Sequence, residues 1–244
     1  MTGLYPVLHQ PQKQQRPTPQ RNCPRGLENL ATLDQVVIKQ ETHMLEVALP
    51  FEVSNKYAVC NNQGQRIFYA AEQSSWFCRQ CCGYARPFVL KLLDNRGVPI
   101  LHVERPCNCG AFYRHCCCCS DFIIVNCEST GEFLGKVEMK CNPCCYGYRI
   151  FDGNKKQIAS IAGPCAVAMC CKSCCCQDQR FKIVDNQGTN IGQVTKMFSG
   201  LIKECCTDSD NFNATFSVNM DVKVKALLLG AAFLIDFHFF ETTR

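Results

Sequence analysis

The residues best suited to chemistry are oxygen-bearing side chains close to the C-terminus. Two carboxylates, Asp208 and Asp210, begin a segment with the length of an EF-hand loop. The ligand positions of such a loop would fall, in order, on Asp208, Asp210, Phe212, Ala214, Phe216 and Asn219. Calcium prefers hard oxygen ligands, which the two carboxylates, the Asn219 amide and backbone carbonyls would supply. The spacing therefore predicts a calcium-like loop over residues 208–219.

Two features weaken this calcium assignment. An EF-hand loop ends in a bidentate Glu, and Asn219 stands at that position, so one negative charge is lost and Asp221 is the nearest substitute. No convincing helical pattern precedes Asp208, so the segment is not a true EF-hand. The alternative is a polar loop that precedes a helix, and any calcium affinity is expected to be weak.

Four adjacent cysteines form a second candidate site. Cys116, Cys117, Cys118 and Cys119 cannot all ligate one metal ion or pair comfortably with one another, but all four can be acylated beside a membrane. Several acyl chains anchor a protein more firmly than one chain does. The run therefore predicts palmitoylation at these four residues, and an inert or metal-binding cluster is the alternative.

Three further cysteine groups have the C-x-x-C spacing of zinc ligands. The pairs are Cys78 and Cys81, Cys141 and Cys144, and Cys171 and Cys174. Two such pairs brought together by the fold would make a zinc site of thiolates, and each pair lies beside a predicted hairpin. The alternative is a set of cysteine-rich loops, with or without acylation.

The overall composition narrows the classes of protein. The 23 cysteines are odd in number and often adjacent, and the N-terminus lacks the apolar stretch of a signal peptide, so we expect free thiols in the reducing cytosol. The net charge of +5 is spread along the chain without a compact Lys/Arg run, so nucleic acid is not an expected partner. The sequence has no nucleophile elbow, metalloprotease motif or paired-carboxylate pattern, so we do not expect an enzyme.

Residues 1–25 differ in composition from the rest of the chain. They are rich in Pro, Gln and Arg and cannot bury enough apolar surface to become ordered. We expect a disordered or polyproline-like tail, which is either a solvated leader or a ligand for proline-recognition domains. Residues 26–244 are then expected to form the folded domain.

Short runs rich in Val, Ile, Phe and Tyr follow the tail, and one unit recurs four times. Each copy has apolar residues two apart, then Asn or Asp with a nearby Gly, then a second apolar run; the copies begin at Tyr57, Leu90, Tyr148 and Phe181. Apolar residues two apart share one face of a strand, and Asn, Asp and Gly accept the positive φ of a tight hairpin. Four hairpins are therefore predicted, with further strands at 33–39, 44–49, 121–126 and 133–139.

The pattern of many short strands predicts an all-β sandwich or closed barrel. The apolar run that follows the strands predicts one C-terminal hydrophobic helix over residues 222–240. The apolar residues of this helix lie on every side, so the helix must be buried all round. They include Leu227, Leu228, Leu229, Phe233, Leu234 and Ile235. The helix would lie either in a bilayer, with Lys223 and Lys225 left in the cytosol, or in the bore of the barrel. Residues 226–240 would be about 22 Å long, short of the ~30 Å hydrocarbon core, and Asp236 is costly in lipid, so the barrel is favoured.

Motifs along most of the chain resemble those of the phospholipid scramblases. The motifs are Cys23-Pro-Arg-Gly-Leu-Glu28, Gly64-Gln-Arg-Ile-Phe-Tyr-Ala-Ala-Glu72, Arg86-Pro-Phe88, Ile161-Ala-Gly-Pro-Cys165, Asp208-Ser-Asp-Asn-Phe212 and Phe233-Leu-Ile-Asp-Phe-His-Phe-Phe-Glu241. The resemblance covers roughly residues 22–241. It implies the tubby-like fold, a closed barrel of about a dozen strands around a central hydrophobic helix. It also supports calcium binding and palmitoylation of the four adjacent cysteines, although the family generally has Asp where this chain has Asn219.

The resemblance implies a calcium-dependent, ATP-independent movement of phospholipids in both directions between leaflets. The implied cofactor is Ca²⁺, and the C-x-x-C spacing adds Zn²⁺ as a second candidate. The implied partners are membrane phospholipids and anionic lipid heads, and homo-oligomers are a candidate assembly. The implied location is the plasma membrane, with the bulk of the chain on the cytosolic side. It would be held there by lipid anchors or by a single span with a cytosolic N-terminus. The alternative function is that of a palmitoylated adaptor or lipid-binding module without intrinsic scrambling.

Overall fold

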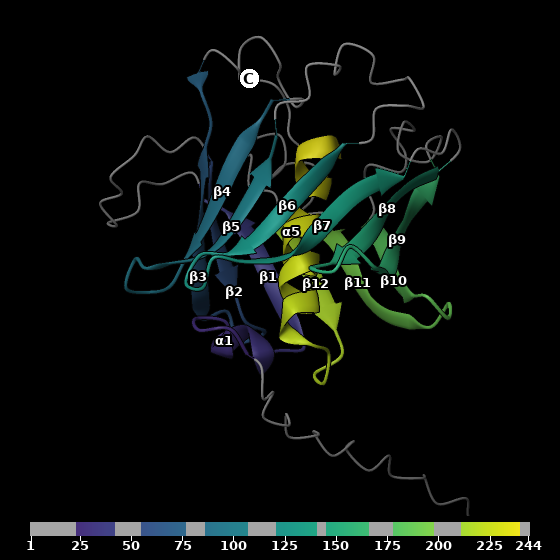
Figure 1. The fold of residues 1–244 in the computed structure, drawn as a ribbon, viewed down its shortest axis with the longest axis horizontal. Helices are drawn as coiled ribbons and strands as arrows, with labels where there is room; N and C mark the ends of the chain where they lie inside the picture. Colours follow the sequence, from purple (N-terminus) through teal and green to yellow (C-terminus); the bar gives the residue numbers. More distant parts are fainter. Residues whose placement is uncertain are drawn as a thin grey trace, which may run out of the picture.

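The computed structural model describes residues 23–41, 55–76, 86–106, 121–140, 145–165, 178–197 and 211–239. In these ranges the chain forms a closed antiparallel barrel and two helices (Figure 1). The helices and strands are α1 (Glu28–Ala31), β1 (Gln35–Gln40), β2 (Lys56–Cys60), β3 (Arg66–Gln73), β4 (Phe88–Leu93), β5 (Pro99–Arg105), β6 (Phe122–Cys127), β7 (Glu132–Lys140), β8 (Cys145–Asp152), β9 (Gln157–Cys165), β10 (Gln179–Asp185), β11 (Asn190–Met197), β12 (Asn211–Phe216) and α5 (Val222–Phe239). The predicted strand at 44–49 and most of the predicted tail lie outside the described residues.

Consecutive strands pair from β2 to β12, and β1 pairs with both β2 and β12 to close the barrel. Alternate residues on each strand face the bore. On β6, for example, Ile123, Val125 and Cys127 are buried while the residues between them are half-buried. Because every second residue of a strand points to the same face, these short strands together give the bore an apolar lining. The expected closed β-barrel of about a dozen strands, which the resemblance implied as a tubby-like fold, is confirmed.

All four predicted hairpins are present, and they share one turn geometry. At each, an Asn or Asp side-chain oxygen accepts hydrogen bonds from the backbone N–H groups two and four residues later. The turn residues are Asn61, Asp94, Asp152 and Asp185. The residue three positions after each has a positive φ: Gly64, Gly97, Lys155 and Gly188. Thus a polar side chain and a left-handed residue close each hairpin locally.

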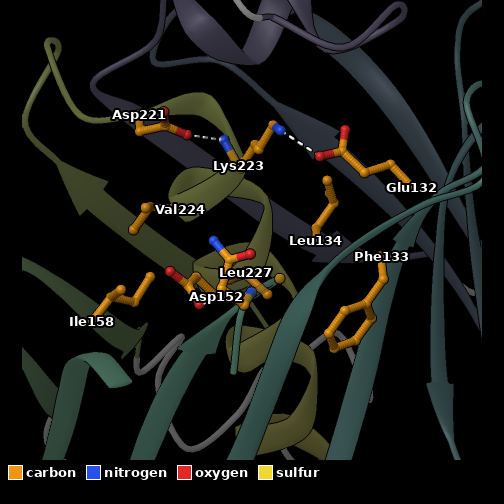
Figure 2. Close-up of a pocket in the computed structure, with 11 residues that line it drawn as sticks. Glu132, Phe133, Leu134, Asp152, Ile158, Asp221, Lys223, Val224 and Leu227 are labelled. Carbon is orange, nitrogen blue, oxygen red and sulfur yellow. Dashed lines mark hydrogen bonds and ion pairs between the residues drawn. The ribbon is translucent and has the colours of Figure 1, made fainter. Parts of the chain in front are cut away.

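The hairpin turns between β2–β3, β4–β5, β6–β7, β8–β9 and β10–β11 lie at one end of the barrel, which we call the turn end. The short helix α1 and the start of α5 lie there too (Figure 1). Leu27 and Leu30 of the α1 region are fully buried, and α1 packs against α5. At the same end, the Lys223 Nζ lies 2.5 Å from a carboxylate oxygen of Glu132 on β7 (Figure 2). The opposite end of the barrel, where the C-terminus of α5 lies, is the loop end.

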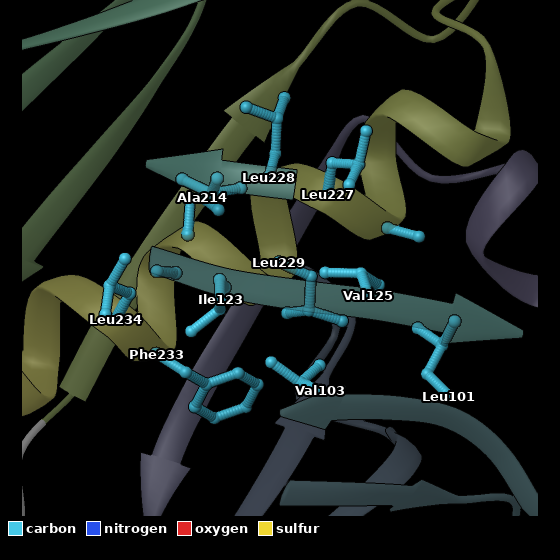
Figure 3. Packing of buried hydrophobic residues seen from close by; sticks show 14 of the residues in the cluster. Leu101, Val103, Ile123, Val125, Ala214, Leu227, Leu228, Leu229, Phe233 and Leu234 are labelled. Atoms are coloured by element: carbon cyan, nitrogen blue, oxygen red, sulfur yellow. The ribbon is translucent and has the colours of Figure 1, made fainter. Parts of the chain in front are cut away.

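Helix α5 fills the bore of the barrel. Leu227, Leu228, Leu229, Phe233, Leu234 and Ile235 are each at most 1% exposed. They pack against strand residues such as Val103, Ile123 and Val125 (Figure 3). Gly230 permits a close approach of α5 to β6, because a Cβ there would lie 3.1 Å from Val125 Cγ2 and 3.2 Å from Ile123 Cδ1. Of the two burials considered for this helix, the barrel is therefore confirmed. Among the described helices, none combines the length and apolar character that a membrane crossing requires.

Two charged residues of α5 are buried with partners. Lys225 is fully buried, and its ammonium donates hydrogen bonds to the carbonyl oxygens of Ala31 (2.8 Å), Leu33 (2.6 Å) and Val218 (2.9 Å). Burial lowers the pKa of Lys225 to about 8, against a smaller opposing effect of Asp34. The Asp236 carboxylate accepts a hydrogen bond from the Tyr57 hydroxyl at 3.1 Å. Because Lys225 and Asp236 both have hydrogen-bond partners, these charged residues are compatible with a buried helix.

Candidate functional site

The described strand ends that flank most of the nominated segments lie at the loop end of the barrel. Six segments outside the described residues connect consecutive strands here: 42–54, 77–85, 107–120, 141–144, 166–177 and 198–210. The strands before each segment end at this rim, and the strands after it begin there. Only five of the 23 cysteines lie in the described ranges, namely Cys23, Cys60, Cys127, Cys145 and Cys165. The antiparallel topology therefore brings the flanks of every predicted cysteine site to one rim.

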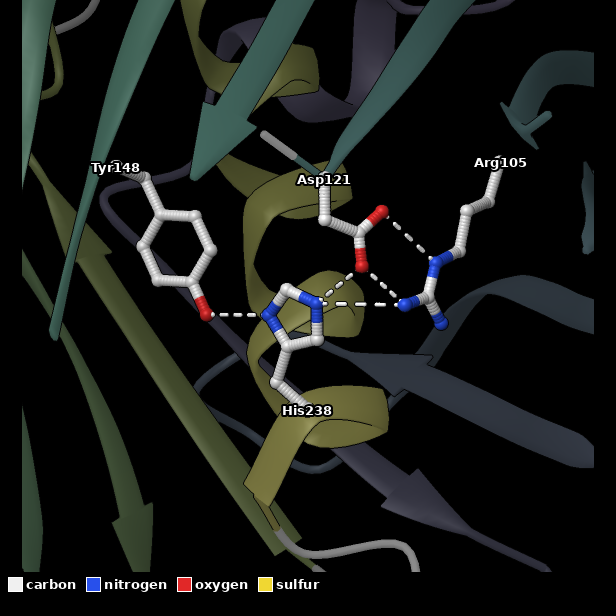
Figure 4. A network of polar contacts seen from close by, with 4 residues as sticks. All are labelled: Arg105, Asp121, Tyr148 and His238. Carbon is white, nitrogen blue, oxygen red and sulfur yellow. Dashed lines mark hydrogen bonds and ion pairs between the residues drawn. The ribbon is translucent and has the colours of Figure 1, made fainter. Parts of the chain in front are cut away.

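A network of four polar side chains lies at the loop end beside the last turn of α5 (Figure 4). Nε2 of His238 is 2.7 Å from Oδ2 of Asp121, and the guanidinium of Arg105 at the end of β5 makes a two-pronged ion pair with the same carboxylate. Nδ1 of His238 is 2.8 Å from the hydroxyl of Tyr148 on β8. Since a carboxylate only accepts, Nε2 of the ring carries a proton. The network ties three strands to the helix C-terminus.

Burial and neighbouring charges shift the pKa values of Asp121 and Tyr148. Burial alone would raise the pKa of the Asp121 carboxyl, but hydrogen bonds and charge attraction from His238 and Arg105 hold this pKa well below its usual range. Burial, helped by the nearby Asp121 charge, raises the pKa of the Tyr148 hydroxyl well above its ordinary value. Asp121 is therefore an anion and Tyr148 a neutral hydroxyl at neutral pH. A set of groups with fixed charge states is suited to positioning the helix end.

A second buried ion pair lies beside the first. Arg86 donates from Nε to Oε1 of Glu72 at 2.8 Å and from a terminal nitrogen to Oε2 at 2.9 Å, and Asn55 donates to Oε2 at 2.7 Å. Glu72 is fully buried, and Arg86 is 4% exposed. The Arg86 guanidinium also lies 4.9 Å from the centre of the Phe237 ring, which stacks on Phe88. The two ion pairs fasten the strand ends that flank the segments 77–85 and 107–120.

The predicted palmitoylation sites Cys116, Cys117, Cys118 and Cys119 lie outside the described residues. The same holds for all six candidate zinc ligands, Cys78, Cys81, Cys141, Cys144, Cys171 and Cys174. Acylation and zinc binding at these residues stay predictions. Within the described ranges, no three His, Cys, Asp or Glu side chains are grouped so as to hold a metal ion.

A strand occupies the middle of the segment 208–219, which the sequence predicted to be one calcium loop, and calcium binding there stays a prediction. Residues 211–216 form strand β12, hydrogen-bonded between β1 and β11. Phe212, Ala214 and Phe216 point into the bore and are at most 5% exposed, and their backbone carbonyls lie in the plane of the sheet. The strand spans about 17 Å from its first to its last residue at ~3.3 Å per residue.

This strand separates the expected ligands. It begins at the loop end, directly after the segment that contains Asp208 and Asp210, which lies outside the described residues. It ends at the turn end, where Asn219 and Asp221 follow. Residues at the two ends of β12 cannot share one ion as EF-hand ligands do. The available signal was the alternation of Phe212, Ala214 and Phe216, which is typical of a strand.

Sequence reasoning also missed the polar network and α1. Arg105, Asp121 and Tyr148 stand in unrelated sequence contexts, so their convergence follows only from the barrel closing around α5. One local signal was available, because Asp236 and His238 interrupt an apolar helix and buried polar groups require partners. The helix α1 has four residues and no side-chain cap, which is too short to produce a helical periodicity.

The comparisons with known proteins agree with this architecture and its sequence motifs. A family model described as Scramblase matches residues 14–242. Phospholipid scramblase 2 from Bos taurus is 40% identical over 253 residues, covering 98% of this chain and 83% of that protein. Phospholipid scramblase 1 from Homo sapiens is 40% identical over 229 residues, covering 93% of this chain and 69% of that protein. Phospholipid scramblase 4 from Homo sapiens is 34% identical over 256 residues, covering 98% of this chain and 74% of that protein. No solved structure matches the chain. On the family match and these identities, the chain belongs to the scramblase family.

Proposed function

We propose that this protein moves phospholipids in both directions between the leaflets of a membrane without using ATP. The observation that carries the proposal is the similarity of almost the whole chain to proteins named phospholipid scramblases. The family match covers the barrel, α5 and the connections at the loop end together. The role is that of a lipid-translocating protein rather than a catalyst of covalent chemistry.

The position of α5 shapes how such a protein would act. The barrel covers the helix on every side, so we infer that lipid movement does not use α5 as a spanning element. A barrel held against one leaflet, alone or as a homo-oligomer, would instead disturb the packing of nearby lipids. Membrane phospholipids, including those with anionic heads, are the proposed partners.

We propose that the loop end faces the membrane, at the cytosolic side of the plasma membrane. Both strands that flank the segment with Cys116–Cys119 reach this rim, so acyl chains there would hold the barrel in one orientation. Trp76, which follows β3 at the same rim, is 63% exposed. An indole ring favours the interface between lipid and water. Trp76 is the single Trp of the chain, so its fluorescence reports on this contact.

Calcium dependence remains part of the proposal in a changed form. Asp208 and Asp210 precede β12 at the loop end, so we propose that calcium bridges their carboxylates to anionic lipid heads, without Asn219. The bound ion would favour the docked state by its differential affinity for it. Replacement of both Asp residues with Asn should then abolish the calcium response, whereas Asn219→Ala should preserve it.

The decisive experiment is reconstitution of the full, acylated chain into vesicles that carry a head-labelled phospholipid in both leaflets. A membrane-impermeant reductant bleaches only the outer leaflet, so lipid movement appears as bleaching beyond about half of the label. We expect extra bleaching that requires calcium and protein but no ATP. Vesicles that bind the protein yet keep the inner label would overturn the proposal.

The second candidate function is a palmitoylated adaptor or lipid-binding module. The observation that favours it is the filled bore, because α5 occupies the space through which a polar lipid head would otherwise pass. In the same assay an adaptor would show calcium-dependent or acyl-dependent vesicle binding, with a blue shift of Trp76 fluorescence and no loss of leaflet asymmetry.

A further inference from the structure

A cavity of 430 Å³ opens at the turn end, far along the barrel from the proposed membrane contact. It lies between the first turns of α5, the start of β7 and the turn that joins β8 to β9 (Figure 2). Nothing in the proposed movement of lipids uses this cavity. Its volume lies within the range of about 300–1,000 Å³ that is usual for small-molecule sites.

The floor of the cavity is apolar. Leu134 on β7 and Leu227 on α5 are buried, whereas Phe133, Ile158 and Val224 are only half-buried. The last three belong to three different elements, so the barrel leaves apolar surface of β7, β9 and α5 uncovered around one opening. Covering that surface with the apolar part of a ligand would be favourable, because it removes apolar area from water.

The polar residues of the cavity carry a net negative charge. Its lining contains three carboxylates and one ammonium, from Glu132, Asp152, Asp221 and Lys223. Lys223 already pairs with Glu132 at 2.5 Å. Figure 2 shows this pair along one side of the opening, with Asp221 near the start of α5 and Asp152 near Ile158. Two carboxylates therefore remain without a cationic partner in the lining.

Each of these two carboxylates uses one oxygen for the backbone. Oδ1 of Asp221 accepts the N–H of Lys223 at 2.7 Å, at the start of α5. Oδ1 of Asp152 accepts the N–H groups of Asn154 and Lys156, both at 2.9 Å. Neither Oδ2 has a hydrogen-bond partner among the residues that the structure describes. These bonds hold both side chains in place and leave an acceptor oxygen on each for a cation.

The arrangement of the acidic side chains in this cavity favours one class of cation. In the described part of the chain no three acidic or other metal-ligating side chains converge on one point, so a bare divalent ion is not the expected ligand. We propose that this cavity binds a small amphiphile made of one apolar group and one organic cation, an ammonium or a quaternary amine. The apolar group lies on the floor, and the cation lies between Asp152 and Asp221.

The proposal is tested by titrating the full chain, in a constant amount of a non-ionic detergent, with octylammonium, octanoate and octanol. These probes share an apolar chain and differ in the charge of the head. We expect octylammonium to bind at least about 10-fold more tightly than octanoate in calorimetric titrations, with octanol between them, because like charges across an interface are unfavourable. Equal affinity for octylammonium and octanoate would overturn the proposal.

Matched variants locate the site. Asp152→Asn should weaken octylammonium binding by about 3- to 10-fold, which is typical for loss of one partly exposed charged contact. Asp185→Asn is the control, because Asp185 makes the same pair of turn bonds, to Gln187 and Thr189, but does not line the cavity. Equal effects of the two variants would contradict the assignment.

A second variant fills the cavity instead of changing its charge. Val224→Trp places a large side chain at a half-buried position on the apolar floor of the cavity and should reduce octylammonium binding at least about 10-fold. Circular dichroism shows whether the variant is folded; if it is not, the Asp152→Asn and Asp185→Asn pair decides. A folded Val224→Trp protein with unchanged affinity would disprove this location.

Two further probes distinguish the source of the ligand. Octyltrimethylammonium stands for a free amphiphilic amine, and dihexanoylphosphatidylcholine, below its micelle concentration, stands for a lipid with a quaternary head. Tighter binding of the first indicates a water-borne amine, and tighter binding of the second indicates a lipid head. Failure of both, with Asp152→Asn without effect, would refute the site while leaving the lipid-movement assay unaffected.

Discussion

The two ends of the barrel close the same bore around α5 with different kinds of interaction. At the turn end, each hairpin is closed by bonds between residues at most four positions apart, as in the turn that Asp185 forms with Gln187 and Thr189. At the loop end, the bonds join residues far apart in sequence, such as Asp121 to His238 and Tyr57 to Asp236. The hairpins of the turn end are therefore specified locally, although Lys223 and Lys225 also bond distant residues there, whereas the loop end depends on the closure of the whole barrel.

The difference indicates that the two ends of the barrel have different structural roles. At the turn end, short turns close the hairpins locally and leave a cavity beside α5 that Val224 lines. The loop end uses buried ion pairs to hold the strand ends from which the long cysteine-rich connections leave. If this rim carries the proposed acyl groups and contacts lipid, firmly held strand ends would fix the orientation of the barrel.

The largest effect is expected from breaking the buried ion pair at the loop end. Arg86→Met leaves the Glu72 carboxylate buried without its cation and should lower the free energy of unfolding by about 3–5 kcal/mol. Arg96→Met is the control, since the Arg96–Asp94 pair at the turn end is exposed and worth about 0–1 kcal/mol. Urea unfolding followed by circular dichroism measures both, and similar losses would erase the contrast between the two ends.

Lys225 tests whether the turn end also depends on distant contacts. Lys225→Met leaves three carbonyl oxygens without their donor and should cost about 2–4 kcal/mol in unfolding experiments. A loss below about 1 kcal/mol would show that the turns alone hold this end.

The pH dependence of the same residue has a defined sign. The pKa of Lys225 is about 8 in the folded protein and 10.5 as the ordinary value, so between these pH values the unfolded chain binds the extra proton. The contribution of Lys225 to stability therefore rises from about pH 8 to pH 10.5. The difference between the unmodified protein and Lys225→Met should follow this rise, and a difference that falls with pH would contradict it.

An intermediate effect is expected from the polar network at acidic pH. The pKa of Asp121 is lower in the folded protein than its ordinary value of 3.8, so its stabilisation is present above that pH and is lost as pH falls below it. Asp121→Asn should cost about 1–3 kcal/mol at pH 7 and flatten the acid limb of stability against pH. An acid limb of unchanged slope would assign acid sensitivity to other carboxylates.

The smallest effect on stability is expected from the cysteine run. Replacing Cys116, Cys117, Cys118 and Cys119 with Ser should change the free energy of unfolding by no more than about 0.5 kcal/mol. The same change should move the protein from the membrane fraction to the soluble fraction of cells, because the proposed acyl anchors are lost. Replacing Cys60 and Cys127, which are buried near the turn end, is the control and should destabilise without moving the protein.

Much of the fold could be predicted from short segments, for an identifiable reason. The turn at Asn61 and the strand alternation of Ile123 and Val125 depend on neighbours in sequence, so local patterns revealed both. The uniform apolar character of Leu227–Leu229 likewise required burial on every side. The alternation of Phe212, Ala214 and Phe216 was equally local, but the flanking carboxylates resembled a calcium loop, so strand β12 was not predicted.

The sequence alone therefore determined that this chain has hairpins, an apolar helix and clustered thiols, because each of these features depends on residues close together in the sequence. Only the tertiary structure decided that the apolar helix lies in the bore and that Asp121 meets His238. Those outcomes depend on which distant residues face the same space once β1 pairs with β12. No local pattern contains that information, since barrel closure is a property of all the strands together.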